Sequence, residues 1–377
     1  MRRPLILSPG HDIHAAAVHW GLHRWGIDAC WPRSGSIHDV AVGGVSIGTG
    51  GETSLAIEGA LSPDNIGSIW HRRARMPDSF PGAPACDHEF LRQEWRLVQQ
   101  NFVALLEGHA GLFWANAPSA ARGAENKLVQ LNAAIACGLS VPPTLVSNEP
   151  AAVANFRARH RRIIYKSFTV HSWLDDAGGA GHIAQAHLIE PAMALDEASI
   201  RLCPGIYQRY IDKVADLRVT VIGNRYFANR VGSSAGGAFV DWRAHVACDD
   251  FTTQPCELPA SLWSKVQALM KRLGLVFGCV DLVLDRNGDL HFLEVNQGGQ
   301  FLFAETWSRS HALLHAMCAM LATGRADYSI DGAPRLSYQA FLDSDACEEW
   351  QRDTAAWAPT AKERASVVSV EPAARVG

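Results

Sequence analysis

Residues 280–296 read Val280-Asp-Leu-Val-Leu-Asp-Arg-Asn-Gly-Asp-Leu-His-Phe-Leu-Glu-Val-Asn296, two β-rich runs on either side of Asn287-Gly288. Asn-Gly is the favoured pair for a two-residue hairpin turn. If these two residues form the loop, the register is determined. It pairs Arg286 with Asp289, Val283 with Phe292, and Asp281 with Glu294. The stretch therefore predicts an antiparallel hairpin that holds two carboxylates opposite each other.

The opposed carboxylates predict a metal site. Directly opposed side chains have Cβ atoms ~4.5–5.5 Å apart, and like charges there destabilise a sheet, so a cation should lie between Asp281 and Glu294. Asn296 points to the same face and adds an amide oxygen, which completes an all-oxygen set that suits Mg²⁺ with nucleotide phosphates. The alternative is a solvent-exposed acidic face. However, residues 275–284 are almost continuously apolar, so Asp281 lies in a central strand where an unpaired carboxylate is costly.

The segments on either side alternate between short helices and strands, which predicts an α/β chain with α+β lobes. We expect an N-terminal α/β domain over 1–118, a small lobe over 119–204, a larger lobe over 205–324 and a loosely attached tail over 325–377. Helices are expected at 14–25, 88–107, 124–137, 149–159 and 258–273. Strands are expected at 4–8, 68–72, 144–147, 163–166, 205–210, 217–223, 226–232, 275–285 and 290–295.

Composition excludes several classes of protein. The chain has 377 residues, of which 48% are hydrophobic and 19% charged, so it can bury a substantial core in more than one domain. Its 34 basic and 38 acidic residues give a net charge of -4, which provides no broad basic field for nucleic acid or an anionic membrane. Nine scattered cysteines without a CxxC pair are typical of reduced thiols, and no secretory or membrane-spanning segment is recognised. We expect a cytoplasmic protein, with a homodimer left open.

Residues 174–182, Leu-Asp-Asp-Ala-Gly-Gly-Ala-Gly-His, are too poor in large side chains to pack. They suit either a mobile flap over a ligand or a plain surface hairpin loop.

The ordered set of these features resembles the ATP-grasp ligases between about 124 and 305. It comprises Lys127 in Glu-Asn-Lys-Leu, Lys166 at the end of a strand, Gln208-Arg-Tyr-Ile211, and Asp281 with Glu294-x-Asn296. The resemblance implies an ATP-grasp fold with an N-terminal pre-ATP-grasp domain, and ATP and two Mg²⁺ ions as cofactors.

By the same resemblance, Lys127 and Lys166 hold ATP phosphates. Residues 208–211 form the hinge between the lobes and read the adenine edge with backbone groups near Arg209, Tyr210 and Ile211, and Asp212 lies near the ribose. Gly178 and Gly179 stand where the family has its phosphate-covering loop, which favours the flap over the plain hairpin loop.

A second group of motifs resembles a subgroup of the family, the peptide-macrocyclising ligases that make microviridin-like graspetides. These motifs are Asp216-Leu-Arg218, Asp241-Trp-Arg243 and the run from Glu294 to Glu305. The resemblance implies that Arg218 and Arg243 are catalytic and clamp the acyl phosphate, since a planar guanidinium binds such charge bidentately. Either arginine could instead be a structural ion-pair partner.

The substrate stays open at this point. The resemblance implies a precursor peptide whose side chains are joined by ester or amide bonds. A small carboxylate and amine, a glutamate-adding ligase and a peptide-binding subunit without catalysis are the alternatives. The N-terminal region is rich in His and Gly and aligns with no motif of the subgroup. His11, His14, His19 and His23 favour surface or packing positions over a metal site.

Overall fold

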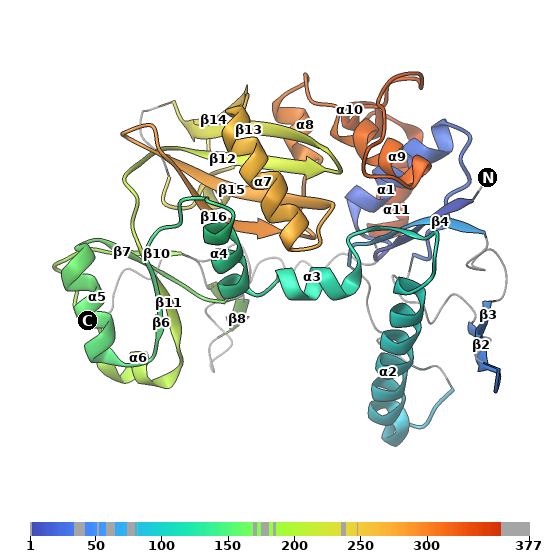
Figure 1. Cartoon of the computed structure of the whole chain (residues 1–377), viewed down its shortest axis with the longest axis horizontal. Helices are drawn as coiled ribbons and strands as arrows, with labels where there is room; N and C mark the ends of the chain where they lie inside the picture. Colours follow the sequence, from blue (N-terminus) through green and yellow to red (C-terminus); the bar gives the residue numbers. More distant parts are fainter. Residues whose placement is uncertain are drawn as a thin grey trace.

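The structure is a computed structural model that describes residues 2–33, 42–50, 53–57, 65–73, 80, 82–168, 172–174, 181–183, 186–234, 239–246 and 248–355. Most of its strands form three main sheets, and helices pack on these sheets (Figure 1). No helix within these residues is long and apolar enough to cross a membrane.

The largest sheet has five antiparallel strands in the order β14-β13-β12-β15-β16. They are β12 (Lys213–Ile222), β13 (Arg225–Ser233), β14 (Phe251–Cys256), β15 (Phe277–Asp285) and β16 (Leu290–Asn296). On β12, Leu217, Val219 and Val221 face a core built with α4 (Lys127–Ala136) and α7 (Ala260–Arg272). The alternate residues Asp216 and Arg218 therefore face the other side of the sheet.

The β15–β16 turn has three residues, so the predicted two-residue loop is wrong. Residues 286–288 form the loop, with Gly288 at φ +88°, and the N–H of Asp285 donates to the carbonyl of Asp289 at 2.9 Å. The Asp285 carboxylate accepts from the N–H groups of Asn287 and Asp289, which stabilises the longer loop. Beyond the turn the register is offset by one, and Leu282, not Val283, lies opposite Phe292.

A β-bulge at Leu293 restores the predicted pairing of the carboxylates. The register shifts again between Asp281 and Leu282, and Asp281 lies opposite Glu294. Because of the extra residue, Leu293 and Glu294 both line one face of β16, whereas Phe292 and Val295 are buried on the other. The prediction of the pair is confirmed, although two irregularities that cancel produce it.

A second antiparallel sheet has the order β10-β7-β11-β6. It contains β6 (Thr144–Ser147), β7 (Ile163–Lys166), β10 (His187–Ile189) and β11 (Gly205–Arg209), and is covered by α5 (Pro150–His160) and α6 (Glu197–Leu202). We expected residue 205 to open the larger lobe, but β11 pairs with β6 and β7. The boundary therefore falls after β11, because Tyr207 packs in the core of this smaller sheet.

The third sheet is parallel, in the order β1-β4-β5. Its strands are β1 (Arg3–Leu7), β4 (Ile66–His71) and β5 (Phe113–Ala115), and its helices include α1 (Ile13–Arg24) and α2 (His88–Glu107). Two hairpins, β2 (Val42–Ile47) with β3 (Thr53–Ile57) and β8 (Ser172–Leu174) with β9 (Gly181–Ile183), complete the strands.

The expected loose tail is wrong for residues 325–355. These residues include α10 (Tyr338–Leu342) and α11 (Asp345–Ala355), and Tyr328, Leu336, Tyr338 and Phe341 are buried in one core with α1. The same core holds α8 (Phe303–Trp307) and α9 (Leu313–Thr323), which is mostly apolar, is buried from Leu313 to Leu321, and contacts both β4 and β12. Residues 325–355 therefore pack back onto the N-terminal unit, where α10 and α11 lie beside α1 (Figure 1). Residues 356–377 lie outside the described part.

The predicted helix 124–137 corresponds to α4, which begins three residues later, at Lys127, after an extended Asn126. A separate helix that was not predicted, α3 (Pro118–Ala124), leads from the N-terminal unit. This start of α4 places Lys127 in the first turn of the helix.

The predicted packing roles hold for Cys279, which is fully buried, and for His14, which is buried and accepts a hydrogen bond from the N–H of Leu302.

Asn116 joins the N-terminal unit to the large sheet. Its side chain is buried at a positive φ of 63°, donates to the carbonyls of Phe277 and Gln297, and accepts from the N–H groups of Val276 and Phe277. The residue thereby holds both the start of β15 and the segment after β16.

We predict that Asn116→Ala lowers the free energy of unfolding by about 3 kcal/mol, because it leaves buried backbone groups unpaired and puts Ala in the left-handed region. Chemical denaturation of the purified variant measures this change. Asn101→Ala is the matched control, since Asn101 is exposed on α2 and, within the described ranges, its side chain bonds only to the Leu97 carbonyl. Equal stability of the two variants would contradict the role of Asn116.

Candidate active site

A cleft of about 1140 Å³ lies between the five-stranded and four-stranded sheets. Eight basic residues line it: Arg72, Arg73, Lys127, Lys166, Arg209, Lys213, Arg218 and Arg243. Five acidic residues line it: Glu125, Asp216, Asp241, Asp281 and Glu294. The cleft is thus positively charged in a chain whose net charge is -4, which favours a polyanionic ligand.

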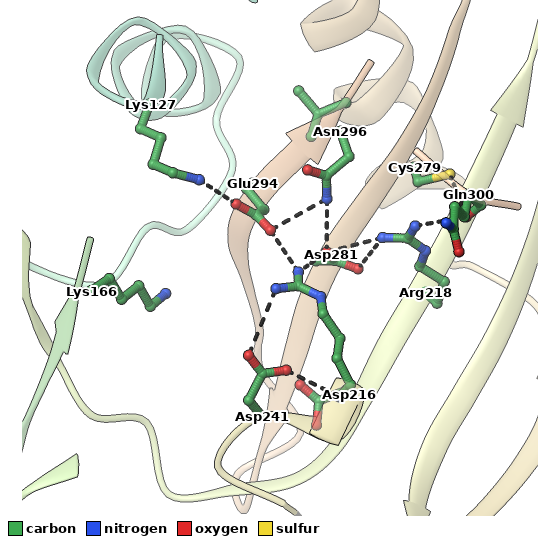
Figure 2. A network of polar contacts seen from close by, with 12 residues as sticks. Lys127, Lys166, Asp216, Arg218, Asp241, Cys279, Asp281, Glu294, Asn296 and Gln300 are labelled. Carbon is green, nitrogen blue, oxygen red and sulfur yellow. Dashed lines mark hydrogen bonds and ion pairs between the residues drawn. The ribbon is translucent and has the colours of Figure 1, made fainter. Parts of the chain in front are cut away.

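Asp281 and Glu294 lie opposite each other in the cleft, and a cationic side chain contacts both (Figure 2). The cation is the Arg243 guanidinium, whose Nη2 lies 2.8 Å from Asp281 Oδ2 and 2.6 Å from Glu294 Oε1. Asn296 donates through Nδ2 to Asp281 at 3.2 Å and to Glu294 at 3.3 Å. The structure therefore brings the three predicted metal ligands together on one face of the hairpin.

Arg218 and Arg243 occupy different environments. Arg218 lies beside Asp281 in the β12–β15 ladder, with Nη1 at 2.9 Å from Oδ1, and its Nη2 donates to the Gln300 carbonyl at 3.0 Å. Its side chain is only 6% exposed, whereas that of Arg243 is 44% exposed. Arg218 thus holds Asp281 in place from the buried side, and Arg243 presents its guanidinium to the cleft.

Lys127 reaches Glu294 from the first turn of α4, with Nζ at 2.6 Å from Oε2. The side-chain amide of Gln130, one turn later, bonds to both the N–H and the carbonyl of Val295 and so fixes α4 against β16. Burial alone would raise the pKa of Glu294, but Lys127 and Arg243 outweigh it and hold this pKa well below the usual range. Glu294 is therefore ionised at all pH values of biochemical interest.

Lys166 approaches the same carboxylates from the smaller sheet (Figure 2). Its Nζ donates to Gln208 Oε1 at 2.9 Å, and Gln208 Nε2 donates to Thr144 Oγ1. Burial lowers the pKa of Lys166 to about 8, although Glu294 opposes the shift. The Gln208 side chain therefore orients a lysine, a role that the sequence did not suggest.

Residues 210–212 connect β11 in the smaller sheet to β12 in the larger one, which matches the predicted hinge position. Arg209, Tyr210 and Ile211 line the cleft. Among the described residues, no hydrogen bond uses the Tyr210 carbonyl or the Ile211 N–H, so both groups are available to a ligand. Asp212 does not line the cleft; it is exposed and pairs with Arg286 at 2.7 Å.

Gly178 and Gly179 lie outside the described residues. The strands that flank their segment, β8 and β9, pair antiparallel, with Leu174 opposite Gly181.

Two parts of the cleft wall were not predicted. Lys213 and Asp216 form a buried ion pair at 2.6 Å, and burial raises the pKa of Asp216 to about 6 despite this lysine. The Asp216-x-Arg218 spacing, which puts both side chains on one face of a strand, was the available signal.

Arg72 is the second part of the wall that was not predicted. It pairs with Asp12 at 2.6 Å and donates to the Gly299 carbonyl at 2.9 Å. No local pattern links Arg72 to residues more than 200 positions away.

Scans of protein-family models and of curated proteins found no match to this chain. Solved structures do match. A ligase from Chryseobacterium gregarium, described as a RiPP-associated ATP-grasp ligase in complex with ADP and a leader and core peptide, has a TM-score of 0.72 at 21% identity, covering 89% of this chain and 98% of its own.

Two further structures agree. The macrocyclase MdnC from Microcystis aeruginosa MRC, bound with its precursor peptide MdnA, has a TM-score of 0.68 at 22% identity over 85% of this chain and 99% of its own. The ATP-grasp ligase PsnB, complexed with a phosphomimetic variant of its minimal precursor, Mg and ADP, has a TM-score of 0.60 at 20% identity over 86% and 99%. The likeness spans nearly the whole of each ligase, and we conclude that this chain has the ATP-grasp fold.

Proposed function

We propose that the chain is an ADP-forming ligase that activates a side-chain carboxylate of a ribosomally made precursor peptide as an acyl phosphate and transfers the acyl group to an amine or hydroxyl. One observation carries the proposal: two opposed carboxylates lie in a positively charged cleft, with a lysine from each of two separate elements directed at them. This arrangement suits ATP with a divalent cation, and the ligases of the same fold were solved with ADP, Mg and precursor peptides.

The donor set fits magnesium. Asp281, Glu294 and Asn296 would hold the ion through oxygen atoms, for which the Asn296 amide turns to present Oδ1 in place of Nδ2. When bound, the metal neutralises charge on the nucleotide phosphates.

In the first step, a carboxylate oxygen of the peptide attacks the γ-phosphorus of ATP, the bond to the β-phosphate oxygen breaks, and ADP leaves. Lys127, from α4, and Lys166, from β7, hold the phosphates with their ammonium groups. Arg243 stabilises the developing charge with its exposed guanidinium, while Arg218 keeps Asp281 in place.

In the second step, the amine or hydroxyl attacks the acyl carbon and inorganic phosphate leaves. The nucleophile loses a proton, and Asp216, which lines the cleft and has a pKa of about 6, is suited to accept it at neutral pH.

The test is incubation of the protein with ATP, Mg²⁺ and the small peptides encoded beside its own gene. Mass spectrometry should show the loss of one water per bond formed, together with ADP. Mild alkali restores the water if the bond is an ester and not if it is an amide. ADP formation with free amino acids alone would support a small-molecule ligase, and nucleotide binding without any ADP formation would contradict catalysis.

We predict that ATP binding weakens as pH rises above about 8. The phosphates bind the protonated Lys166, so once its pKa of about 8 is passed the free protein must take up a proton on binding, and affinity falls by up to about tenfold per pH unit. Glu294 and Asp241 favour the charged form, and Lys127 and Arg243 oppose it. Calorimetry on either side of pH 8 measures the slope.

Lys166→Met should remove this pH dependence, whereas Lys265→Met on α7, outside the cleft, should retain it. The same slope in the wild-type protein and in Lys166→Met would show that Lys166 does not bind the phosphates.

A further inference from the structure

A second hollow of about 410 Å³ adjoins the cleft between the end of β4, α2 and α3. We call it the α2–α3 chamber; its lining residues are His71, Arg72, Arg73, Arg96, Gln99, Gln100, Val103, Pro118, Ala121, Arg122, Glu125 and Gln297. Arg72, Arg73, Glu125 and Gln297 line the cleft as well, so the two spaces are continuous. Gln297 follows Asn296 directly, which places the chamber entrance next to the carboxylate pair.

The chamber is basic, and three of the four arginines that line it have no ion-pair partner in the described part of the chain. Arg73, Arg96 and Arg122 are exposed, and none of them forms an ion pair with any residue that the structure describes. Glu125 is the acidic member of the lining, and its Oε1 accepts from Gln297 Nε2 at 2.8 Å. Three guanidinium groups around one small space repel one another, so an anionic ligand would relieve the repulsion.

Arg72 adds a buried donor to the wall of the chamber. Its side chain is 0% exposed, its Nε donates to Asp12 and its Nη1 to the Gly299 carbonyl, but its Nη2 has no hydrogen-bond partner among the described residues. A buried charged donor without a partner is unfavourable, and because Arg72 lines the chamber as well as the cleft, an oxygen of a ligand that spans the two spaces would satisfy it.

We propose that the α2–α3 chamber binds a second carboxylate of the peptide substrate, one that is not being activated, and so selects acidic peptides and sets which carboxylate reacts. This inference rests on the proposed function. A guanidinium binds a carboxylate bidentately, and Gln99 and Gln100 supply further amide donors. Because the chamber opens beside Asn296, one extended peptide could place one acidic side chain in the chamber and another at the acyl-transfer site.

The test uses a fluorescein-labelled peptide of alternating Glu and Gly, its Gln counterpart, and the full chain without nucleotide. Fluorescence anisotropy should show about tenfold tighter binding of the Glu peptide. Arg96→Ala and Arg122→Ala should each weaken the Glu peptide by about tenfold and leave the Gln peptide unchanged. The matched control is Arg92→Ala, since Arg92 lies on the same helix, pairs with Glu89 and does not line the chamber.

Equal affinity of the wild-type protein for the two peptides, or an equal loss for both peptides in the arginine variants, would overturn the inference. Displacement of the Glu peptide by inorganic phosphate as readily as by unlabelled Glu peptide would also overturn it, since the chamber would then bind anions in general. ATP binding by Arg96→Ala and Arg122→Ala, measured by calorimetry, should equal that of the wild type. If the wild type forms no ADP but prefers the Glu peptide through Arg96 and Arg122, the proposed function fails and the acidic-peptide site stands.

Discussion

Replacing Glu294 by Gln should reduce ADP formation by at least about 10³-fold while the protein still folds. The substitution keeps the size of the side chain but removes the negative charge that faces Lys127 and Arg243 and that is proposed to bind magnesium. The fold should persist because the core contacts of β16 come from Phe292 and Val295 on the opposite face. The measurement is ADP release with hydroxylamine as the acceptor, alongside circular dichroism.

Glu257→Gln provides the matched control. Glu257 follows β14 in the same sheet region, is exposed, and bonds to the Tyr226 hydroxyl at 2.6 Å outside the cleft. Its activity should equal that of the wild type. ADP release near the wild-type rate in a folded Glu294→Gln protein would remove Glu294 from the metal site.

Arg243→Lys should lower kcat by about 10²–10³-fold and change the Kd for ATP only slightly. A lysine keeps the charge and could replace the one nitrogen, Nη2, that contacts both carboxylates, but it lacks the planar fork with which a guanidinium clamps an acyl phosphate bidentately. Single-turnover ADP release measures the chemical step, and calorimetry measures ATP binding. Arg230→Lys, on the exposed side of β13, is the control.

The outcomes separate three roles for Arg243. Loss of kcat with normal ATP affinity supports stabilisation of the transition state. Partial activity of Arg243→Lys would indicate that the positive charge alone contributes to catalysis. Full activity would indicate that Arg243 forms only a surface ion pair. Arg218→Ala should behave differently, since it leaves buried Asp281 with fewer partners and should lower thermal stability as well as activity.

The local parts of the site could be predicted from the sequence. An apolar strand that carries one carboxylate, an Asn-Gly turn and a second carboxylate in register place Asp281 and Glu294 together, and the structure agrees. Their role as metal ligands stays a prediction. The sequence could not show which of Arg218 and Arg243 presents its guanidinium to the cleft. Both follow an Asp-x-Arg pattern, and they differ only in how deeply the fold buries them.

Contacts between segments that are far apart in the sequence could not be predicted. Arg72 meets Gly298 and Gly299 because the parallel sheet of the N-terminal unit packs beside the loop after β16, and no periodicity encodes that contact. Residues 325–355 lack the long apolar runs that predict a core, yet a few aromatic side chains such as Tyr338 and Phe341 suffice to pack them against α1. The helix α9 was not among the predicted helices, and its position in contact with both β4 and β12 was not predicted either.

The three-residue turn and the bulge at Leu293 also have a consequence for how this hairpin tolerates changes in length. Twelve residues separate Asp281 from Glu294: four ladder residues on each strand, three in the loop, and Leu293 in the bulge. Loss of one loop residue would leave a two-residue loop and keep the bulge, and loss of Leu293 would leave the three-residue loop and remove the bulge. In both cases Asp281 still lies opposite Glu294, because neither deletion changes the pairs that lie between. Single deletions at either place should therefore be tolerated, and related chains of different loop length can keep the same carboxylate pair.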